Sequence, residues 1–140
     1  MLKKINYRII FLLLLILIPV GVFIYKKTPT ENEIQNPAQQ KINALLKKIK
    51  EYPTAENYLD LSLAYYRINE HKKSIEAADN AMALKPNYAH AYNNKCVSLI
   101  KMGKHDEAIK ACEKAIEIEP SYKLAKNNLN WAKEMKRKAQ

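Results

Sequence analysis

Glycine is scarce in this chain of 140 residues, which contains only Gly21 and Gly103. A phosphate-binding loop needs several glycines close together, so the sequence excludes that kind of nucleotide site. No H-E-x-x-H or C-x-x-C pattern occurs, and no cluster of histidine, cysteine and acidic residues offers a set of metal ligands. We therefore predict no bound metal and no cofactor.

Acidic residues are outnumbered, with 14 Asp and Glu against 24 Lys and Arg and a net charge of +10. Residues 1–27 hold five of the basic residues and none of the acidic ones, so half of the net charge lies in this short segment. The rest of the chain has a mild basic excess and shows neither an aromatic platform on strands nor a helix-turn-helix DNA-reading pattern. We therefore predict no nucleic-acid partner.

The sequence contains one 34-residue unit written twice, at residues 55–88 and 89–122. A period near 34 residues is typical of helix–turn–helix solenoids, in which each unit is a pair of antiparallel helices. The eight identical pairs are Ala55/Ala89, Tyr58/Tyr92, His71/His105, Ile75/Ile109, Ala77/Ala111, Ala81/Ala115, Pro86/Pro120 and Tyr88/Tyr122.

Each unit shows the spacing of two helices. In the first unit, apolar and small residues recur at three- and four-residue steps from Tyr58 to Tyr65, and again from Ser74 to Met82. Pro86 ends the second stripe, because proline has no N–H and pushes the preceding residue out of helical geometry.

The two units resemble the tetratricopeptide repeat, with a closing proline in register and small residues such as Ser62 and Ser74 where two helices must approach closely. The resemblance implies an all-α helix–turn–helix solenoid of two full repeats. One position departs from the pattern, since Lys95 stands where the family usually has leucine and where the first unit has Leu61. Its aliphatic stem can still pack while its amine reaches solvent.

Capping helices are expected on both sides of the repeats, because solenoid repeats bury little surface alone and about three are usually needed for stability. We assign a leading cap to residues 38–54, with Asn36 as N-cap and Pro37 at the first helical position, and a basic trailing cap to residues 123–140. The six predicted helices are residues 38–51, 55–68, 71–84, 89–102, 105–118 and 121–138.

An apolar run precedes the repeats. We divide the N-terminal part into a basic flank (1–8), a transmembrane signal anchor (9–25) and a linker (26–37). Tyr7 and Tyr25 flank the uncharged run and lie 18 residues apart, which is roughly 27 Å of helix and close to the thickness of a bilayer core. The alternative is a cleaved signal peptide, but no pair of small residues marks a cleavage site.

The basic flanks predict the orientation of the anchor. Lys3, Lys4, Arg8 and the amino terminus precede the apolar run, whereas only Lys26 and Lys27 follow it before the first acidic residues. Since the more basic side stays in the cytoplasm, we expect a single-pass membrane protein with a cytoplasmic N-terminus and a periplasmic or extracellular repeat domain.

The resemblance to the family also implies a concave face, formed by the first helix of each repeat, that binds a peptide or helix of a partner protein. The alternative is that this face is covered by the linker or by a second copy of the chain. The candidate groove residues recur at the 34-residue offset and are Leu59, Leu63, Tyr66, Arg67, Asn93, Asn94, Val97, Ile100, Lys101, Asn127, Asn128 and Trp131.

Two residue types raise the question of chemistry. Cys96 and Cys112 each lie eight residues from Lys104, the centre of a predicted helical turn, so they stand at the same height in an antiparallel helix pair. They form either a disulfide, which requires an oxidising compartment, or two small buried thiols.

His71 and His105 are explained by the repeat and need no catalytic role, so we predict that the chain is not an enzyme.

We therefore expect a membrane-anchored adaptor for protein–protein interaction, acting in envelope assembly or in the biogenesis of protein complexes. One alternative is a receptor or co-chaperone-type repeat protein that faces the cytoplasm on an organelle or inner membrane. Another is a structural module that oligomerises with itself. Chaperone-binding members of the family use a basic clamp, but Leu59 and Leu63 stand where that clamp has lysine and asparagine, and only Asn94 matches.

Overall fold

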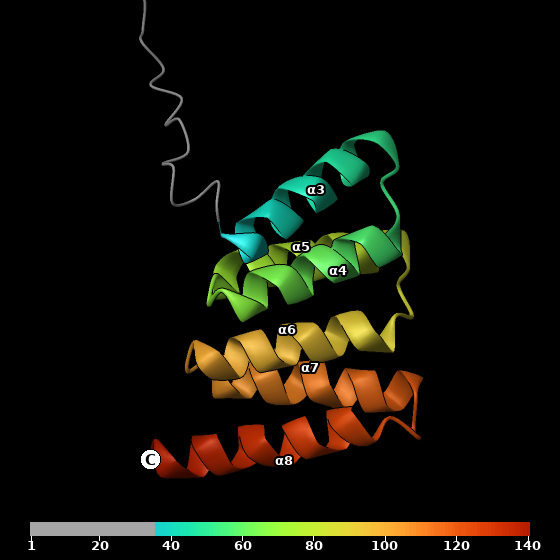
Figure 1. Cartoon of the computed structure of the whole chain (residues 1–140). Coiled ribbons are helices and arrows are strands. Elements are labelled where there is room, and N and C mark those ends of the chain that lie inside the picture. Colours follow the sequence, from blue (N-terminus) through green and yellow to red (C-terminus); the bar gives the residue numbers. More distant parts are fainter. Residues whose placement is uncertain (1–35) are drawn as a thin grey trace, which may run out of the picture.

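The structure is a computed structural model, and it describes residues 36–140 (Figure 1). The predicted flank, the anchor and nearly all of the linker lie outside these residues. Among the helices that are described, none combines the length and the apolar composition needed to span a bilayer.

Six α-helices make up the described part of the chain, as the repeat pattern predicts. Each begins and ends within two residues of its predicted bounds. They are α3 (Pro37–Glu51), α4 (Ala55–Arg67), α5 (His71–Leu84), α6 (Ala89–Lys101), α7 (His105–Ile118) and α8 (Lys123–Lys138).

The helices are stacked one after another from α3 to α8 (Figure 1). Every helix contacts the next one along the chain, and α6 also contacts both α4 and α8. Within residues 36–140, no Cα atom of α5 lies within 8 Å of one in α3 or α7. The stack therefore has a first layer of α4, α6 and α8, and a second layer of α3, α5 and α7.

The same turn joins the two helices of each repeat. Asn69 in the first repeat and Gly103 in the second adopt left-handed backbone conformations, with φ of 61° and 74°. The next N–H in each repeat, that of Glu70 or Lys104, donates to a carbonyl five residues earlier at 3.0 Å. This is a Schellman-type helix end, in which glycine or asparagine is favoured because most other residues resist a positive φ.

Small residues let the two layers approach closely. The hydroxyl oxygens of Ser62, Ser74 and Ser98 are fully buried and form a chain, with distances of 3.2 Å from Ser62 to Ser74 and 2.8 Å from Ser74 to Ser98. The chain joins α4, α5 and α6 across the boundary between the repeats. It also satisfies polar groups that would be costly to bury alone.

The core has two clusters of apolar residues. One joins the leading helix to the first repeat and includes Ile42, Leu45 and Leu61. The other joins the second repeat to α8 and includes Leu99 and the fully buried Ala132, with Leu129, Trp131 and Met135 packed against it. Both flanking helices therefore complete the core, as expected of caps.

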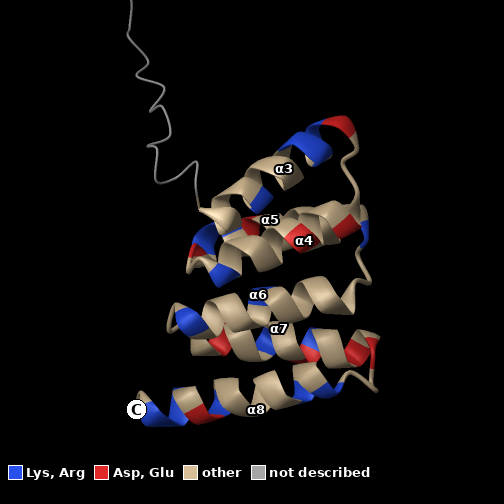
Figure 2. Ribbon diagram, in the orientation of Figure 1, with Lys and Arg blue, Asp and Glu red and all other residues tan. Residues whose placement is uncertain are grey.

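The outer faces of both terminal helices are polar. In α3, Ala44 and Lys47 are exposed, although they stand one repeat before Ala78 and Ala81, which are fully buried. In α8, Asn130 is exposed one repeat after the buried Cys96. Figure 2 shows that lysine and arginine outnumber acidic residues on both of these helices.

Asn36 caps α3 as predicted, because its side-chain oxygen accepts a hydrogen bond of 2.9 Å from the Ala38 N–H. At the other end of the stack, Lys136 of α8 donates to Asp106 of α7 at 2.6 Å. This hydrogen bond holds the pKa of the Asp106 carboxyl below its usual value. The first contact caps α3 locally, and the second ties α8 to α7.

Candidate functional site

A groove crosses the first-layer helices of both repeats and the trailing cap. It is a hollow of about 240 Å³ that draws its lining from α4, α6 and α8. The lining residues are Leu63, Tyr66, Asn93, Asn94, Val97, Leu124, Asn128 and Trp131. Because these helices lie side by side and in contact, residues one repeat apart fall into rows across the groove.

Apolar side chains in the groove are left open to solvent. Leu63 is 37% exposed and Leu124 is 52% exposed. Trp131 is partly buried and packs against the second core cluster, and the ammonium group of Lys101 lies 5.1 Å from the centre of its ring. This distance is within the range of a cation–π contact, so the ring is held in place from two sides.

Asparagine side chains supply the polar part of the groove. The Asn128 amide nitrogen donates to the Asn93 side-chain oxygen at 2.8 Å, and Asn93 is only 3% exposed. This bond orients Asn128, whose amide oxygen accepts no hydrogen bond within residues 36–140. Asn94 also lines the hollow, and its side chain makes no hydrogen bond within residues 36–140. An amide of this kind can pair with the backbone of a bound polypeptide.

Most of the predicted groove residues meet at this hollow. Leu63, Tyr66, Asn93, Asn94, Val97, Asn128 and Trp131 line it, and Lys101 touches it through Trp131. Leu59, Arg67 and Asn127 are not among the lining residues. Leu124 was not predicted, although its position one helical turn before Asn128 on the same face of α8 was a usable signal.

Ile100 needs a correction, because it does not face the groove. It is 3% exposed and belongs to the second core cluster. Its counterpart one repeat earlier, Tyr66, is only partly buried and lines the hollow. The residues clustered with Ile100 come from α6, α7 and α8, so its side chain is part of the core between the second repeat and the trailing cap.

Cys96 and Cys112 face each other between α6 and α7. Their Cα atoms are 5.4 Å apart, the two sulfurs are bonded, and both residues are fully buried. The first repeat has Ser62 and Ala78 at the same two positions. The second repeat therefore has a covalent link where the first has only packing and a hydrogen bond.

The histidines occupy structural positions. His71 and His105 are the first residues of α5 and α7, and the Nδ1 atom of each is buried without a hydrogen-bond partner. The His90 ring lies 4.7 Å from that of Tyr122. Within the described chain, no group of three or more metal-binding side chains comes together.

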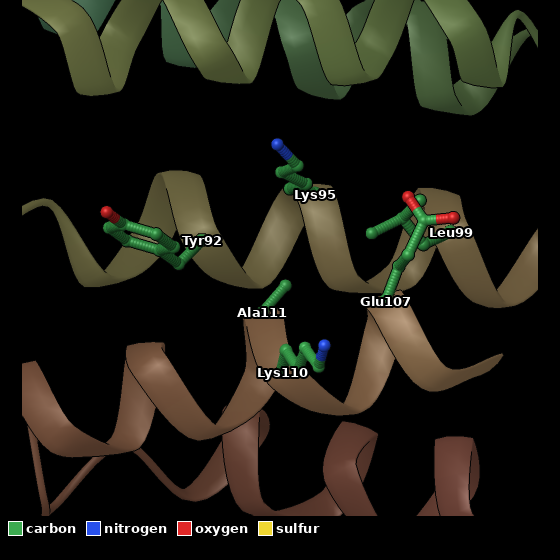
Figure 3. A pocket seen from close by; sticks show the side chains of 6 residues that line it. All are labelled: Tyr92, Lys95, Leu99, Glu107, Lys110 and Ala111. Carbon is green, nitrogen blue, oxygen red and sulfur yellow. The ribbon is translucent and has the colours of Figure 1, made fainter. Parts of the chain in front are cut away.

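A second kind of hollow lies between the layers, and it occurs in both repeats. Figure 3 shows the hollow of the second repeat, where Tyr92, Lys95 and Leu99 come from α6 and Glu107, Lys110 and Ala111 from α7. Their counterparts one repeat earlier line the equivalent hollow of the first repeat. Because the hollow recurs with the repeat, we interpret it as the wedge left where three helices meet.

Lys95 ties this wedge to the first repeat. Its ammonium group donates to Asp79 of α5 at 2.7 Å, while its side chain is 30% exposed. The position at which the family usually has leucine therefore holds an ion pair between the repeats. The amine of Lys95 was predicted to reach solvent, but it pairs with the Asp79 carboxylate instead.

Comparisons with known proteins agree with this architecture. Residues 89–122 match the family model described as tetratricopeptide repeat. A crystal structure of MamA is 35% identical with a TM-score of 0.66, and the match covers 71% of this chain and 55% of that one. This chain thus spans about half the length of that structure. No curated protein matches it in sequence.

Two further solved structures share the fold at lower identity. The first tetratricopeptide-repeat domain of human RPAP3 is 22% identical with a TM-score of 0.70, over 72% of this chain and 80% of that one. The corresponding domain of Sgt2 from Aspergillus fumigatus is 23% identical with a TM-score of 0.69, over 73% and 70%. With the matched repeat at residues 89–122 and the stacked helix pairs, these likenesses show that the described part of the chain has the tetratricopeptide-repeat fold.

Proposed function

We propose that the chain is a membrane-anchored interaction module whose groove binds a peptide or helix of a partner protein. The observation that carries this proposal is the open apolar row of Leu63, Val97 and Trp131, in which Leu63 remains exposed, while the exposed Leu124 lines the same hollow. Exposed apolar patches rimmed by polar groups mark interaction sites in soluble domains. The asparagines beside the row offer hydrogen bonds to a polypeptide backbone.

The relatives supply an analogy for this use of the fold. A structure of the first repeat domain of Spaghetti (RPAP3) was solved with an HSP90 peptide, SRMEEVD. That protein is 23% identical to this chain, so the likeness concerns the fold. Because Leu59 and Leu63 replace the lysine and asparagine of the chaperone clamp, we do not propose a chaperone tail as the ligand.

The compartment belongs to the same proposal. The apolar run Ile9–Ile24 with its basic N-terminal flank favours a cytoplasmic N-terminus and a repeat domain outside the cytoplasm. The paired cysteines support this side, because disulfides persist in oxidising compartments. Protease added to intact cells, or to spheroplasts where an outer membrane is present, should degrade the repeat domain. Protection until the membrane is lysed would place the domain in the cytoplasm.

Site-specific photo-cross-linking tests the groove, and the chain offers a matched pair of positions. Leu124 lies in the groove and Leu84 lies at the end of α5 in the second layer, and both are 52% exposed. A photoreactive residue at Leu124 should form an adduct with a partner polypeptide in native membranes, and one at Leu84 should not. Leu63→Glu should abolish the adduct, because it places a charge in the apolar row.

The other outcomes would contradict the proposal. Equal adducts from Leu124 and Leu84 would show that the groove has no preference. An adduct made only of two copies of the chain would favour the self-oligomerising module instead.

A further inference from the structure

We infer that the ligand of the groove is an acidic polypeptide segment, with large apolar side chains along its middle and carboxylates along one edge. This inference rests on the proposed peptide-binding function and adds the chemistry and orientation of the ligand. It follows from three rows of side chains that cross the first-layer helices at successive positions along each helix.

The middle row is apolar. Leu63 of α4, Val97 of α6 and Trp131 of α8 occupy the same position of three successive first-layer helices, and all three line the hollow. A ligand that covers this row must itself be apolar, since burying a polar group there without a partner would be costly.

The row on one side of it holds amides. Asn94 and Asn128 lie three residues before Val97 and Trp131, so they are one helical turn toward the N-terminal ends of their helices. Asp60 has the same position in α4. This edge offers amide donors and acceptors together with one carboxylate, so it does not attract an anion.

The row on the other side holds cations. Arg67 and Lys101 lie four residues after Leu63 and Val97, in the last turns of α4 and α6, and both are exposed. The ammonium group of Lys101 reaches over the Trp131 ring, which places it at the rim of the hollow. The third member of this row, Met135, is uncharged.

The two cations of this row have no acidic partner among residues 36–140. Within residues 36–140 neither Arg67 nor Lys101 forms an ion pair, whereas Lys95 and Lys136 are held by carboxylates on neighbouring helices. A ligand carboxylate at this edge therefore competes with no internal acid. Because amides and cations stand on opposite sides of the apolar row, only one orientation of an acid-edged segment satisfies both edges.

Selection from a random peptide library tests this inference without assuming a ligand sequence. Phage-displayed random peptides are selected on the full-length protein in lipid nanodiscs, with empty nanodiscs for subtraction. The same selection is run on Arg67→Glu/Lys101→Glu, on the neutral Arg67→Gln/Lys101→Gln, and on Lys72→Glu/Lys110→Glu. The last variant is the matched control, because it reverses two exposed charges of the second layer. Circular dichroism verifies the helicity of each variant.

The expected result is that the charge of the selected peptides depends on Arg67 and Lys101. The wild type and the second-layer control should select peptides rich in Asp and Glu, the neutral variant should lose this preference, and the reversed variant should favour Lys and Arg. Trp131 is the sole tryptophan of the chain, so its fluorescence reports binding of a synthetic selected peptide. Reversing both cations should weaken binding of an acidic peptide by about ten-fold.

Two different failures can be told apart. Peptides that bind the wild type without acidic enrichment, or with a preference that the reversed variant retains, would overturn this inference and leave peptide binding in place. If no peptide binds above the background of empty nanodiscs, the peptide-binding function falls together with this inference.

Discussion

Breaking the link between Cys96 and Cys112 should destabilise the repeat domain by a predictable amount. The bond closes a loop of 16 residues that contains the whole turn between α6 and α7. In the chain-entropy account, closing a loop of this size stabilises the folded state by about 3 kcal/mol, because the cross-link restricts the unfolded chain. A typical domain has a total stability of only about 5–15 kcal/mol, so this bond is a substantial fraction.

A control variant without the cross-link replaces both cysteines by alanine. Alanine is the residue at position 78 in the first repeat, and it avoids a buried hydroxyl at position 96, because the serine that bonds Ser62 in the first repeat is replaced by Ala108 in the second. Both sites are fully buried and the replacements are small, so the change in packing is slight beside the loss of the cross-link. The double variant and the chemically reduced wild type should therefore unfold at nearly the same denaturant concentration.

Equilibrium denaturation in urea, followed by circular dichroism, measures the difference between oxidised and reduced protein. A loss of about 3 kcal/mol corresponds to a fall in melting temperature of roughly 10–20 °C for a domain of this size. Identical midpoints for the two forms would refute the chain-entropy reasoning. Two reactive thiols in denatured, unreduced protein from its native membrane would show that the bond is absent there, and would weaken the extracytoplasmic assignment.

Three further changes test the packing. Ser74→Ala should lower the free energy of unfolding by about 1–3 kcal/mol, since it leaves the buried hydroxyls of Ser62 and Ser98 without their shared partner. Urea denaturation should show that replacing all three serines by alanine lowers this free energy by less than the sum of the three single changes. Gly103→Ala should lower the free energy of unfolding by about 1 kcal/mol through the positive φ alone, because nothing lies within 4 Å of the added carbon. Gly103→Asn should have a melting temperature closer to that of the wild type. Truncation after Tyr122 removes α8 and should lower the free energy of unfolding by several kcal/mol. At roughly 4–8 °C per kcal/mol, the melting temperature should fall by more than 10 °C. An unchanged melting temperature would show that α8 does not dock.

The repeat period was enough to predict the fold. A 34-residue spacing with proline in register implies helix pairs, and residues 36–140 form six helices in that order. The turns were also visible, because Asn69 and Gly103 interrupt the stripes where a left-handed residue is needed. The helices and the turns both depend on local sequence, and the same local pattern recurs in each 34-residue unit.

Contacts that cross between repeats were harder to predict. The serine chain was not foreseen, because Ser98 has Ala64 as its counterpart and so does not stand out in an alignment of the units. The cysteines could be placed at the same height but not on facing sides, since sequence does not determine the rotation of one helix against another. The structure supplies that rotation, with a Cα separation of 5.4 Å.

The site was predicted less well than the fold because a periodic sequence does not produce periodic burial. Tyr66 and Ile100 hold equivalent positions, yet only Ile100 is buried, in the core cluster that the second repeat shares with α8. An alignment of the units treats the two alike, and so it assigned both to the groove. In a stack this short, every candidate position must be weighed by its distance from the two ends.

The end faces also limit how the stack can be used. Both outer faces are polar, and both terminal helices are rich in lysine. Stacking two copies end to end would bring like charges together and bury little apolar surface, so extension into a longer solenoid is disfavoured. On the proposed function, a ligand would then meet the groove of a single copy, to which α8 supplies both Leu124 and Trp131. Because α8 also buries Ala132 in the second core cluster, the helix that completes the fold is the helix that completes the groove. Deleting it would remove stability and binding together, so the two are separated only by single changes on its groove-facing side.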